Sequence, residues 1–313
     1  MAGYAVGMRR GRTVTVRQIV AAACLLLALA ACGDDASSAP SGPFAVGTRS
    51  VTWVDDSRPT PAFGDQPEQP ARQIQTDIWY PAAGDPAAPP AADAPPADGP
   101  FPVIVFNHGQ QGEPQQYALS FETWTRAGYV VVAPRHPLTI RGGPGALFVE
   151  DIQGELGDVP FVIDRVEDEL SDIADVDHLA VAGHSSGAIV ARGVGFNTCC
   201  HDDRVDAVLV EALIPIELDG QYVADLEETP MMLLHGTEDR DYPLDVAHQV
   251  FDAAEAPKVF VTLQGGDHSE AFRTGPLAEQ TSQAALAFFD FTLRGRDEAW
   301  DALAQVPGAE LAA

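Results

Sequence analysis

The chain has 313 residues, of which 46% are hydrophobic, and its formal net charge at pH 7 is −28. A hydrophobic content of this size can build one large core, and α/β folds of this length are common, so we expect a single folded domain. A strongly acidic surface repels nucleic acids and anionic lipid headgroups, and both are therefore excluded as expected partners.

The first 31 residues have the pattern of a secretory signal peptide. Four arginines precede an uncharged apolar run, Ile19 to Ala31, which is shorter than the roughly 20 residues that span a bilayer core. The run ends in Leu29-Ala30-Ala31-Cys32, which resembles the lipobox of bacterial lipoproteins. That resemblance implies that residues 1–31 are removed, that Cys32 carries the lipid, and that the protein is anchored outside the cytoplasm to the bacterial cell membrane. An ordinary secretory leader, and therefore a secreted protein, is the alternative.

Two low-complexity stretches flank or interrupt the expected domain. Residues 32–43 are mostly small, polar and proline-bearing, which is typical of a flexible tether, and we place the domain at residues 44–313. Residues 82–100 are rich in alanine and proline and are expected to form a surface loop, because these residues alone cannot build a core. Cys199 and Cys200 lack the spacing of a metal site, so no metal is expected. A vicinal disulfide and two buried thiols both remain open for this pair.

Strand and helix signals alternate along the rest of the chain. Two short β-branched and aromatic runs, 51–54 and 74–80, have no helix between them and predict an antiparallel start to a sheet. Apolar runs that are typical of strands covered on both faces follow at 102–109, 129–134, 179–185, 205–213, 231–239 and 258–266, with helix-like stretches at 113–127, 159–171, 186–196, 244–254 and 277–293. This alternation forces parallel pairing through crossover helices, so we expect an α/β fold with helices on both faces of a mostly parallel sheet. Residues 137–158 interrupt the rhythm and predict a loop or a small cap.

A serine motif lies at one strand-to-helix junction. Gly183-His184-Ser185-Ser186-Gly187 stands directly between the apolar strand and the helix that follows it. A tight turn at this point exposes the serine, the glycines avoid clashes, and the N-terminus of the next helix stabilises developing negative charge. The motif predicts that Ser185 is a nucleophile.

A serine hydroxyl needs a base that takes its proton and an acid that orients the base. His268 follows the last predicted strand, and the glycines before it allow a sharp loop back toward the serine, so it is the expected base. Asp239 ends another predicted strand at the edge where ligands gather in α/β sheets, and it is the preferred acid. Glu211 ends the strand before it and remains an alternative acid.

An oxyanion hole requires two N–H donors, each of which lowers the barrier by roughly 3 to 4 kcal/mol. The backbone N–H of Ser186 is the expected first donor. The second is expected from the loop after the strand at 102–109, and we nominate the backbone N–H of Gln110. His108, His184 and His235 are expected to pack or hydrogen-bond around strand ends, and His184 could also line the pocket.

The segments VIVFNHG, AGYVVVAPRHP, GHSSGA, HGTEDRDYP and GGDHSEAF together resemble the α/β-hydrolase superfamily over roughly residues 45–295. The resemblance is to its platelet-activating-factor acetylhydrolase-like and dienelactone-hydrolase-related serine esterases. It implies an eight-stranded, mostly parallel sheet and ester hydrolysis through an acyl-enzyme without a cofactor. Carried over, the nucleophile is Ser185, the base is His268 and the oxyanion donors are Gln110 and Ser186.

Two departures from these relatives matter. Dienelactone hydrolases use a cysteine nucleophile where this chain has Ser185, so lactone specificity does not transfer. In the acetylhydrolase relatives the acid follows the earlier strand, at the position of Glu211, which keeps the choice against Asp239 open. Secreted polyester hydrolases share the architecture, so a polymeric ester is also a possible substrate.

The motifs therefore predict a hydrolase of small acyl, lipid-like or polyester carboxylic esters that acts outside the cytoplasm. Peptide or amide hydrolysis by the same three residues is the second enzymatic hypothesis. A binding lipoprotein that has lost catalysis is the alternative from another class. Such a protein is expected to lack one of the three residues, whereas Ser185, Asp239 and His268 are all present.

Overall fold

The computed structural model describes residues 42–222, 229–255 and 257–312. The predicted signal peptide, the predicted lipid site Cys32 and most of the predicted tether lie outside the described residues. Within the described ranges, the structure contains no helix with the length and apolarity that a membrane crossing requires.

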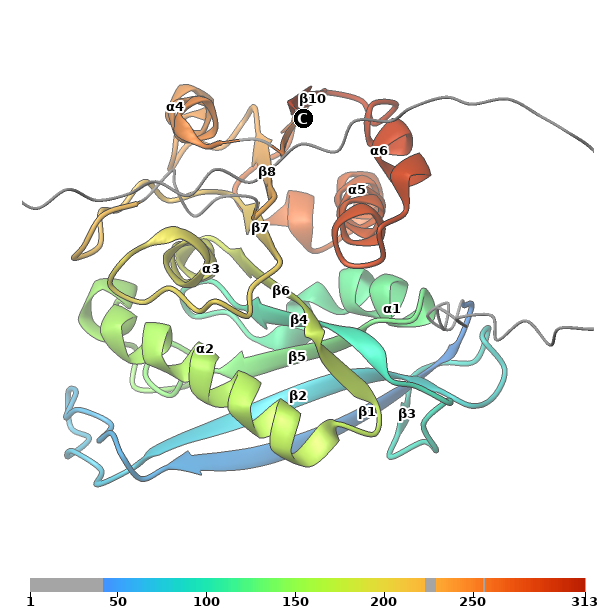
Figure 1. Cartoon of the computed structure of the whole chain (residues 1–313). Coiled ribbons are helices and arrows are strands. Elements are labelled where there is room, and N and C mark those ends of the chain that lie inside the picture. The colour runs from blue at the N-terminus through green and yellow to red at the C-terminus, as the bar shows by residue number, and fades with distance from the viewer. Residues whose placement is uncertain (1–41, 223–228, 256, 313) are drawn as a thin grey trace, which may run out of the picture. The chain divides into compact units, whose positions relative to one another are not determined.

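One sheet runs through the described part of the chain (Figure 1). Its six central strands run parallel, in the spatial order β5-β4-β6-β7-β8-β9. Their bounds are β4 (Phe101–Asn107), β5 (Val130–Arg135), β6 (Ala174–His184), β7 (Ala207–Glu211), β8 (Met231–Gly236) and β9 (Lys258–Leu263). Nearly all of their residues are buried, which explains the near-continuous apolar runs in the sequence.

Further strands, which pair antiparallel except for β3 (Ala91–Ala92) with β1 (Ala45–Asp55), extend both edges of the sheet. β1 pairs antiparallel with β2 (Arg72–Ala82) over its whole length, as the sequence predicted for the start of the sheet. β2 also pairs antiparallel with β5. Two further strands, β3 and β10 (Ala309–Ala312), bring the number in the described residues to ten. The expectation of eight was too low because these edge strands are very short and rich in alanine, which has little strand propensity.

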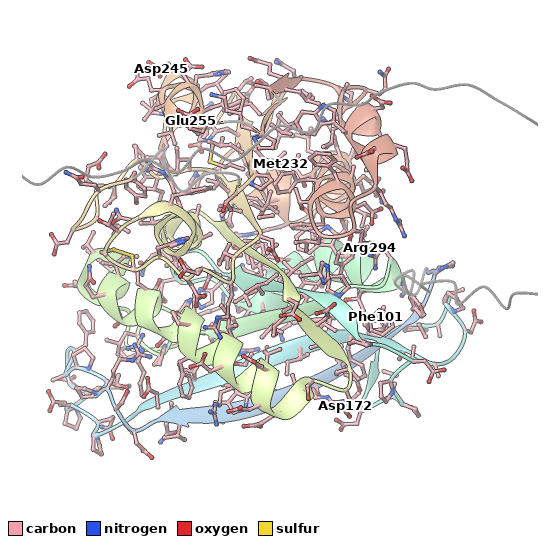
Figure 2. The ribbon with its side chains drawn as sticks, viewed as in Figure 1. Phe101, Asp172, Met232, Asp245, Glu255 and Arg294 are labelled. Atoms are coloured by element: carbon pink, nitrogen blue, oxygen red, sulfur yellow. A yellow bond between two sulfur atoms is a disulfide. The ribbon has the colours of Figure 1, made fainter. Side chains whose placement is uncertain are left out.

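Helices cover both faces of the sheet, as Figure 1 shows. α2 (Phe148–Leu170), α3 (Ser186–Phe196) and α4 (Leu244–Ala253) contribute to one hydrophobic cluster, whereas α1 (Ala118–Arg126), α5 (Gly275–Thr292) and α6 (Asp297–Leu303) contribute to the other. Two short 3₁₀ helices, η1 (Pro114–Tyr117) and η2 (Glu270–Phe272), complete the set. Figure 2 labels Phe101 and Met232, which are fully buried, and Asp245 and Glu255, which are exposed. The predicted α/β architecture is thus confirmed.

The prediction of a loop or small cap at 137–158 was wrong for residues 148–158, because α2 already begins at Phe148. Gly154 and Gly157 weaken the helix signal in the sequence, since glycine is a poor helix former. In the structure both glycines make room for arginines. A Cβ at Gly154 would overlap the guanidinium of Arg72, and one at Gly157 would overlap that of Arg58.

The structure pairs Cys199 with Cys200 in a vicinal disulfide, in the loop that follows α3. The same loop is attached to a later segment, because the N–H of Thr198 donates to the carbonyl of Gln221 at 3.0 Å. Of the two arrangements that the sequence left open, the structure has the disulfide.

Candidate active site

Ser185 occupies a strained turn between β6 and α3. Its φ of 57° lies in the left-handed region, which residues other than glycine rarely adopt. The N–H of Ser185 donates to the carbonyl of Glu211 at 2.9 Å, which holds the turn against β7. A Cβ at Gly183 would overlap the carbonyl of Gly187, and a Cβ at Gly187 would overlap that of Asn107. The two glycines of the motif are therefore required by close backbone contacts.

Ser185, His268 and Asp239 form a hydrogen-bonded chain. The Oγ of Ser185 lies 2.8 Å from Nε2 of His268, and Nδ1 of His268 lies 2.6 Å from Oδ2 of Asp239. Because Nδ1 faces a carboxylate, it carries the proton, and Nε2 is left to accept from the serine hydroxyl. The other oxygen of Asp239 accepts the N–H groups of Asp241 and Tyr242 at 3.0 and 2.9 Å. The structure thus brings together three residues that lie on separate loops after β6, β8 and β9.

Glu211, the alternative acid, has a different environment. Within the described ranges, no hydrogen bond joins its carboxyl to His268, although Glu211 ends the strand beside β6. Burial raises the pKa of Glu211 to about 8. A carboxyl that is protonated at neutral pH cannot balance the charge of an imidazolium, and this geometry favours Asp239.

The two backbone N–H groups that the sequence nominates for an oxyanion hole belong to Ser186 and Gln110. Ser186 is the first residue of α3, so its N–H has no acceptor within the helix. The N–H of Gln110 also has no acceptor among the described residues. Its loop comes close to the serine, because a Cβ at Gly109 would lie 3.1 Å from the Cβ of Ser185.

The loop that contains Gln110, residues 108–112, is held by buried side-chain and backbone hydrogen bonds. Nδ1 of His108 donates to the carbonyl of Gly109 at 2.9 Å, and Nε2 of His108 accepts the N–H of His136 at 3.2 Å. Burial lowers the pKa of His108 to about 3, which keeps the ring neutral and able to accept. The N–H of Gln111 donates to the carbonyl of Thr139 at 2.9 Å. The loop therefore has a fixed shape before any substrate binds.

A buried ionic network supports this loop from α2, and sequence reasoning missed it. The guanidinium of Arg72, which is 1% exposed, donates to both oxygens of Asp151 and of Asp158. Asp158 also accepts Nδ1 of His136 at 2.9 Å, and Nε2 of His136 donates to Oδ1 of Asn107 at 3.1 Å. Asn107 directly precedes the loop. The available signal was the spacing of acidic residues at 151, 155 and 158, which places them on one helix face.

One group of residues in the described ranges has the spacing of a metal site, namely Asp239, Asp241 and His268. Both ring nitrogens of His268 are already hydrogen-bonded, to Ser185 and to Asp239. These hydrogen bonds explain why the ligand atoms lie close together, and they leave neither ring nitrogen of His268 available to bind a metal ion.

Comparisons with known proteins concern the fold and the type of enzyme. Residues 68–244, more than half of the chain, match the family model described as Chlorophyllase. No curated protein matches the chain. Among solved structures, a ferulic acid esterase from Streptomyces cinnamoneus superimposes with a TM-score of 0.65 at 20% sequence identity, covering 88% of this chain and 98% of the esterase. That likeness shows a common fold.

The superfamily and the type of enzyme that the motifs predicted are confirmed, whereas the acetylhydrolase-like and dienelactone-related branch stays a prediction. The chain belongs to the chlorophyllase family and is a carboxylic ester hydrolase with the α/β-hydrolase fold.

Proposed function

We propose that the protein is a serine esterase in which Ser185 is the nucleophile, His268 the general base and Asp239 the acid that orients it. The observation that carries this proposal is the hydrogen-bonded chain from Ser185 through His268 to Asp239, with lengths of 2.8 and 2.6 Å. The strained turn at Ser185 adds support, because backbone strain of this kind persists where the surroundings enforce it and is concentrated at functional sites.

In the first half of the reaction, Nε2 of His268 takes the proton of Ser185 while Oγ attacks the ester carbonyl. The imidazolium is stabilised by Asp239, whose buried carboxylate already accepts two backbone N–H groups. Negative charge develops on the former carbonyl oxygen. The N–H groups of Ser186 and Gln110 would stabilise it, which is worth roughly 3 to 4 kcal/mol of barrier per donor.

In the second half, the intermediate expels the alcohol, which receives its proton from His268, and an acyl group remains on Ser185. A water molecule then gives a proton to His268 as it attacks the acyl carbonyl. Collapse of the second intermediate releases the carboxylic acid and returns the proton to Ser185. Every step uses groups of the chain and water.

The substrate that we propose is an uncharged ester with an apolar part. Three large hydrophobic side chains are exposed in the described residues, and two of them, Leu147 and Val149, stand at the start of α2. They adjoin Ala146, whose carbonyl accepts Nε2 of Gln110 at 2.5 Å. Two exposed apolar side chains therefore follow, in the chain, a residue that is hydrogen-bonded to the proposed oxyanion loop. The net charge of −28 disfavours anionic substrates.

We further propose that the enzyme works outside the cytoplasm, attached to the membrane by acyl chains on Cys32. Support comes from the leader-like residues 1–31 and the lipobox-like sequence that ends in Cys32. Labelling of cells with a radioactive or clickable palmitate should mark the protein, and Cys32→Ala should abolish the label. A protein that remains unlabelled and is released into the medium would instead be a secreted enzyme.

The activity is tested with the full chain in detergent on p-nitrophenyl esters from acetate to palmitate. The names of the matched family and of the structural relative suggest chlorophyll and methyl ferulate as two further probes. Hydrolysis that disappears in a folded Ser185→Ala variant supports the proposal. Hydrolysis that persists in this variant, or a folded wild type that cleaves none of the esters, overturns it.

A further inference from the structure

A buried hydrogen-bond relay connects His268 with the loop that contains Gln110. Its centre is His184, the residue before Ser185, which is 1% exposed. Nε2 of His184 lies 2.7 Å from the carbonyl oxygen of His268, and Nδ1 lies 3.0 Å from the hydroxyl of Tyr117. The same hydroxyl lies 3.3 Å from the backbone nitrogen of Gly109.

The direction of each bond follows from the groups involved. A carbonyl oxygen only accepts, so Nε2 of His184 carries a proton. Burial lowers the pKa of His184 to about 3, so its ring is neutral and Nδ1 must accept from the hydroxyl of Tyr117. The oxygen of Tyr117 then accepts the N–H of Gly109. The relay runs without conflict from Gly109 through Tyr117 and His184 to His268.

The surroundings leave the ring of His184 little freedom. The ring of Phe272, itself 1% exposed, lies 5.2 Å from it between centroids. The guanidinium carbon of Arg273 lies 5.8 Å from the centroid of the Tyr117 ring, and its positive charge adds to the lowering of the pKa of His184. The relay is therefore enclosed by protein and keeps one protonation state.

We propose that His184 is a positioning residue for acyl transfer: it holds the backbone carbonyl of His268 and, through Tyr117, the backbone of Gly109. The base and the oxyanion loop are thereby aligned on Ser185 by the same side chain. His184 contacts the backbone of the base and not the reacting atoms. This inference rests on the proposed function, because it takes His268 as the base. Loss of alignment by about 1 Å can cost roughly 100-fold in rate.

Four variants of the full chain separate positioning from packing. His184→Phe keeps an aromatic ring and removes both hydrogen bonds. His184→Gln places an amide N–H within reach of the carbonyl of His268. Tyr117→Phe deletes one hydroxyl from the relay. His178→Phe is the matched control, since His178 is an exposed histidine near the start of β6, at the end of the strand opposite Ser185.

For hydrolysis of p-nitrophenyl butyrate, His184→Phe should lower kcat about 10- to 100-fold with KM changed less than about 3-fold. His184→Gln should recover at least about 5-fold of that loss, and Tyr117→Phe should lower kcat by about 3- to 10-fold. His178→Phe should match the wild type. The proton on Nδ1 of His268, bonded to Asp239, gives a low-field ¹H NMR signal that should shift or broaden in His184→Phe and be restored in His184→Gln.

Several outcomes would overturn the inference. One is a His184→Phe variant within about 2-fold of the wild type in kcat, and another is a His184→Gln variant that is no better than His184→Phe. If His184→Phe does not fold, the test rests on Tyr117→Phe. An unchanged kcat together with an unchanged NMR signal in Tyr117→Phe contradicts the relay. If the wild type hydrolyses no ester, the proposed function fails, while the NMR comparison still tests how His268 is held.

Discussion

Oδ2 of Asp239 lies 2.6 Å from Nδ1 of His268, whereas the carboxyl of Glu211, one strand away, is buried with its pKa raised to about 8. The two acids thus lie at the carboxyl ends of neighbouring strands of the same sheet, but they have different surroundings. Asp239 accepts hydrogen bonds from two backbone N–H groups and from an imidazole. This contrast makes the two acids separable by mutation.

Asp239→Asn should lower kcat by about 10³- to 10⁴-fold, because an amide favours the wrong tautomer of His268 and cannot balance the imidazolium. The measurement is kcat on p-nitrophenyl butyrate, with the far-UV and near-UV circular dichroism of the variant compared with the wild type. Retention of more than a tenth of the activity in a folded Asp239→Asn variant would contradict Asp239 as the acid that orients His268.

Glu211→Gln should leave kcat within about 3-fold at pH 7, because the native carboxyl is already uncharged there. Its effect is expected on stability. The pKa of Glu211 is about 8 in the folded protein, compared with 4.5 for an ordinary glutamate such as that of the unfolded chain. Between pH 4.5 and about pH 8, the folded protein therefore binds one more proton than the unfolded chain. Its stability contribution is present below pH 4.5 and is lost as the pH rises to about 8. The difference in Tm, variant minus wild type, should therefore increase from pH 5 to pH 8.5, and a constant difference would contradict the assignment.

The sequence was sufficient for most of the fold because its signals are strong and local. The apolar strands and the helices between them matched the structure at α3, α4 and α5 to within about two residues. The first half of α2 could not be predicted, since Gly154 and Gly157 suppress the helix signal. They are tolerated because Arg72 and Arg58 fill the space beside them, a tertiary contact that no local pattern reveals.

The motif context nominated the candidate site residues, whereas the residues that support them could not be predicted from the sequence. Ser185, His268 and Asp239 stand at strand ends that the pattern of elements identifies. Tyr117 carries no motif, and its bonds to Gly109 and His184 depend on how η1 packs against β6. Further support for Asp239 over Glu211 also came from the structure, since both lie at the carboxyl ends of parallel strands and only the loop geometry distinguishes them.

Leu147 and Val149 are expected to favour substrates with long apolar chains. A Leu147→Ser/Val149→Ser double variant should lose about 5-fold or more in kcat/KM on p-nitrophenyl laurate, because about 1 kcal/mol of apolar contact is removed. Its activity on the acetate should be unchanged. Val54→Ser is the matched control, since Val54 is the third exposed large hydrophobic residue in the described ranges and lies on β1. An equal loss on both esters, or the same loss in the control, would exclude this role.

Arg72→Met should lower the free energy of unfolding by about 3 to 5 kcal/mol, because it leaves the buried carboxylates of Asp151 and Asp158 without their main partner. Urea denaturation at pH 7 provides the measurement. The control is Arg165→Met, which breaks an exposed ion pair with Asp168 and should cost less than about 1 kcal/mol. Similar values for the two variants would show that the buried network does not stabilise the fold.

The most direct measurement is the site of covalent labelling by a fluorophosphonate, read by peptide mapping and mass spectrometry. A serine activated as proposed should form one adduct, on Ser185, and the rate of labelling should fall by at least about 100-fold in a folded His268→Ala variant. An adduct on another residue, or a folded wild type that is not labelled, would contradict Ser185 as the nucleophile.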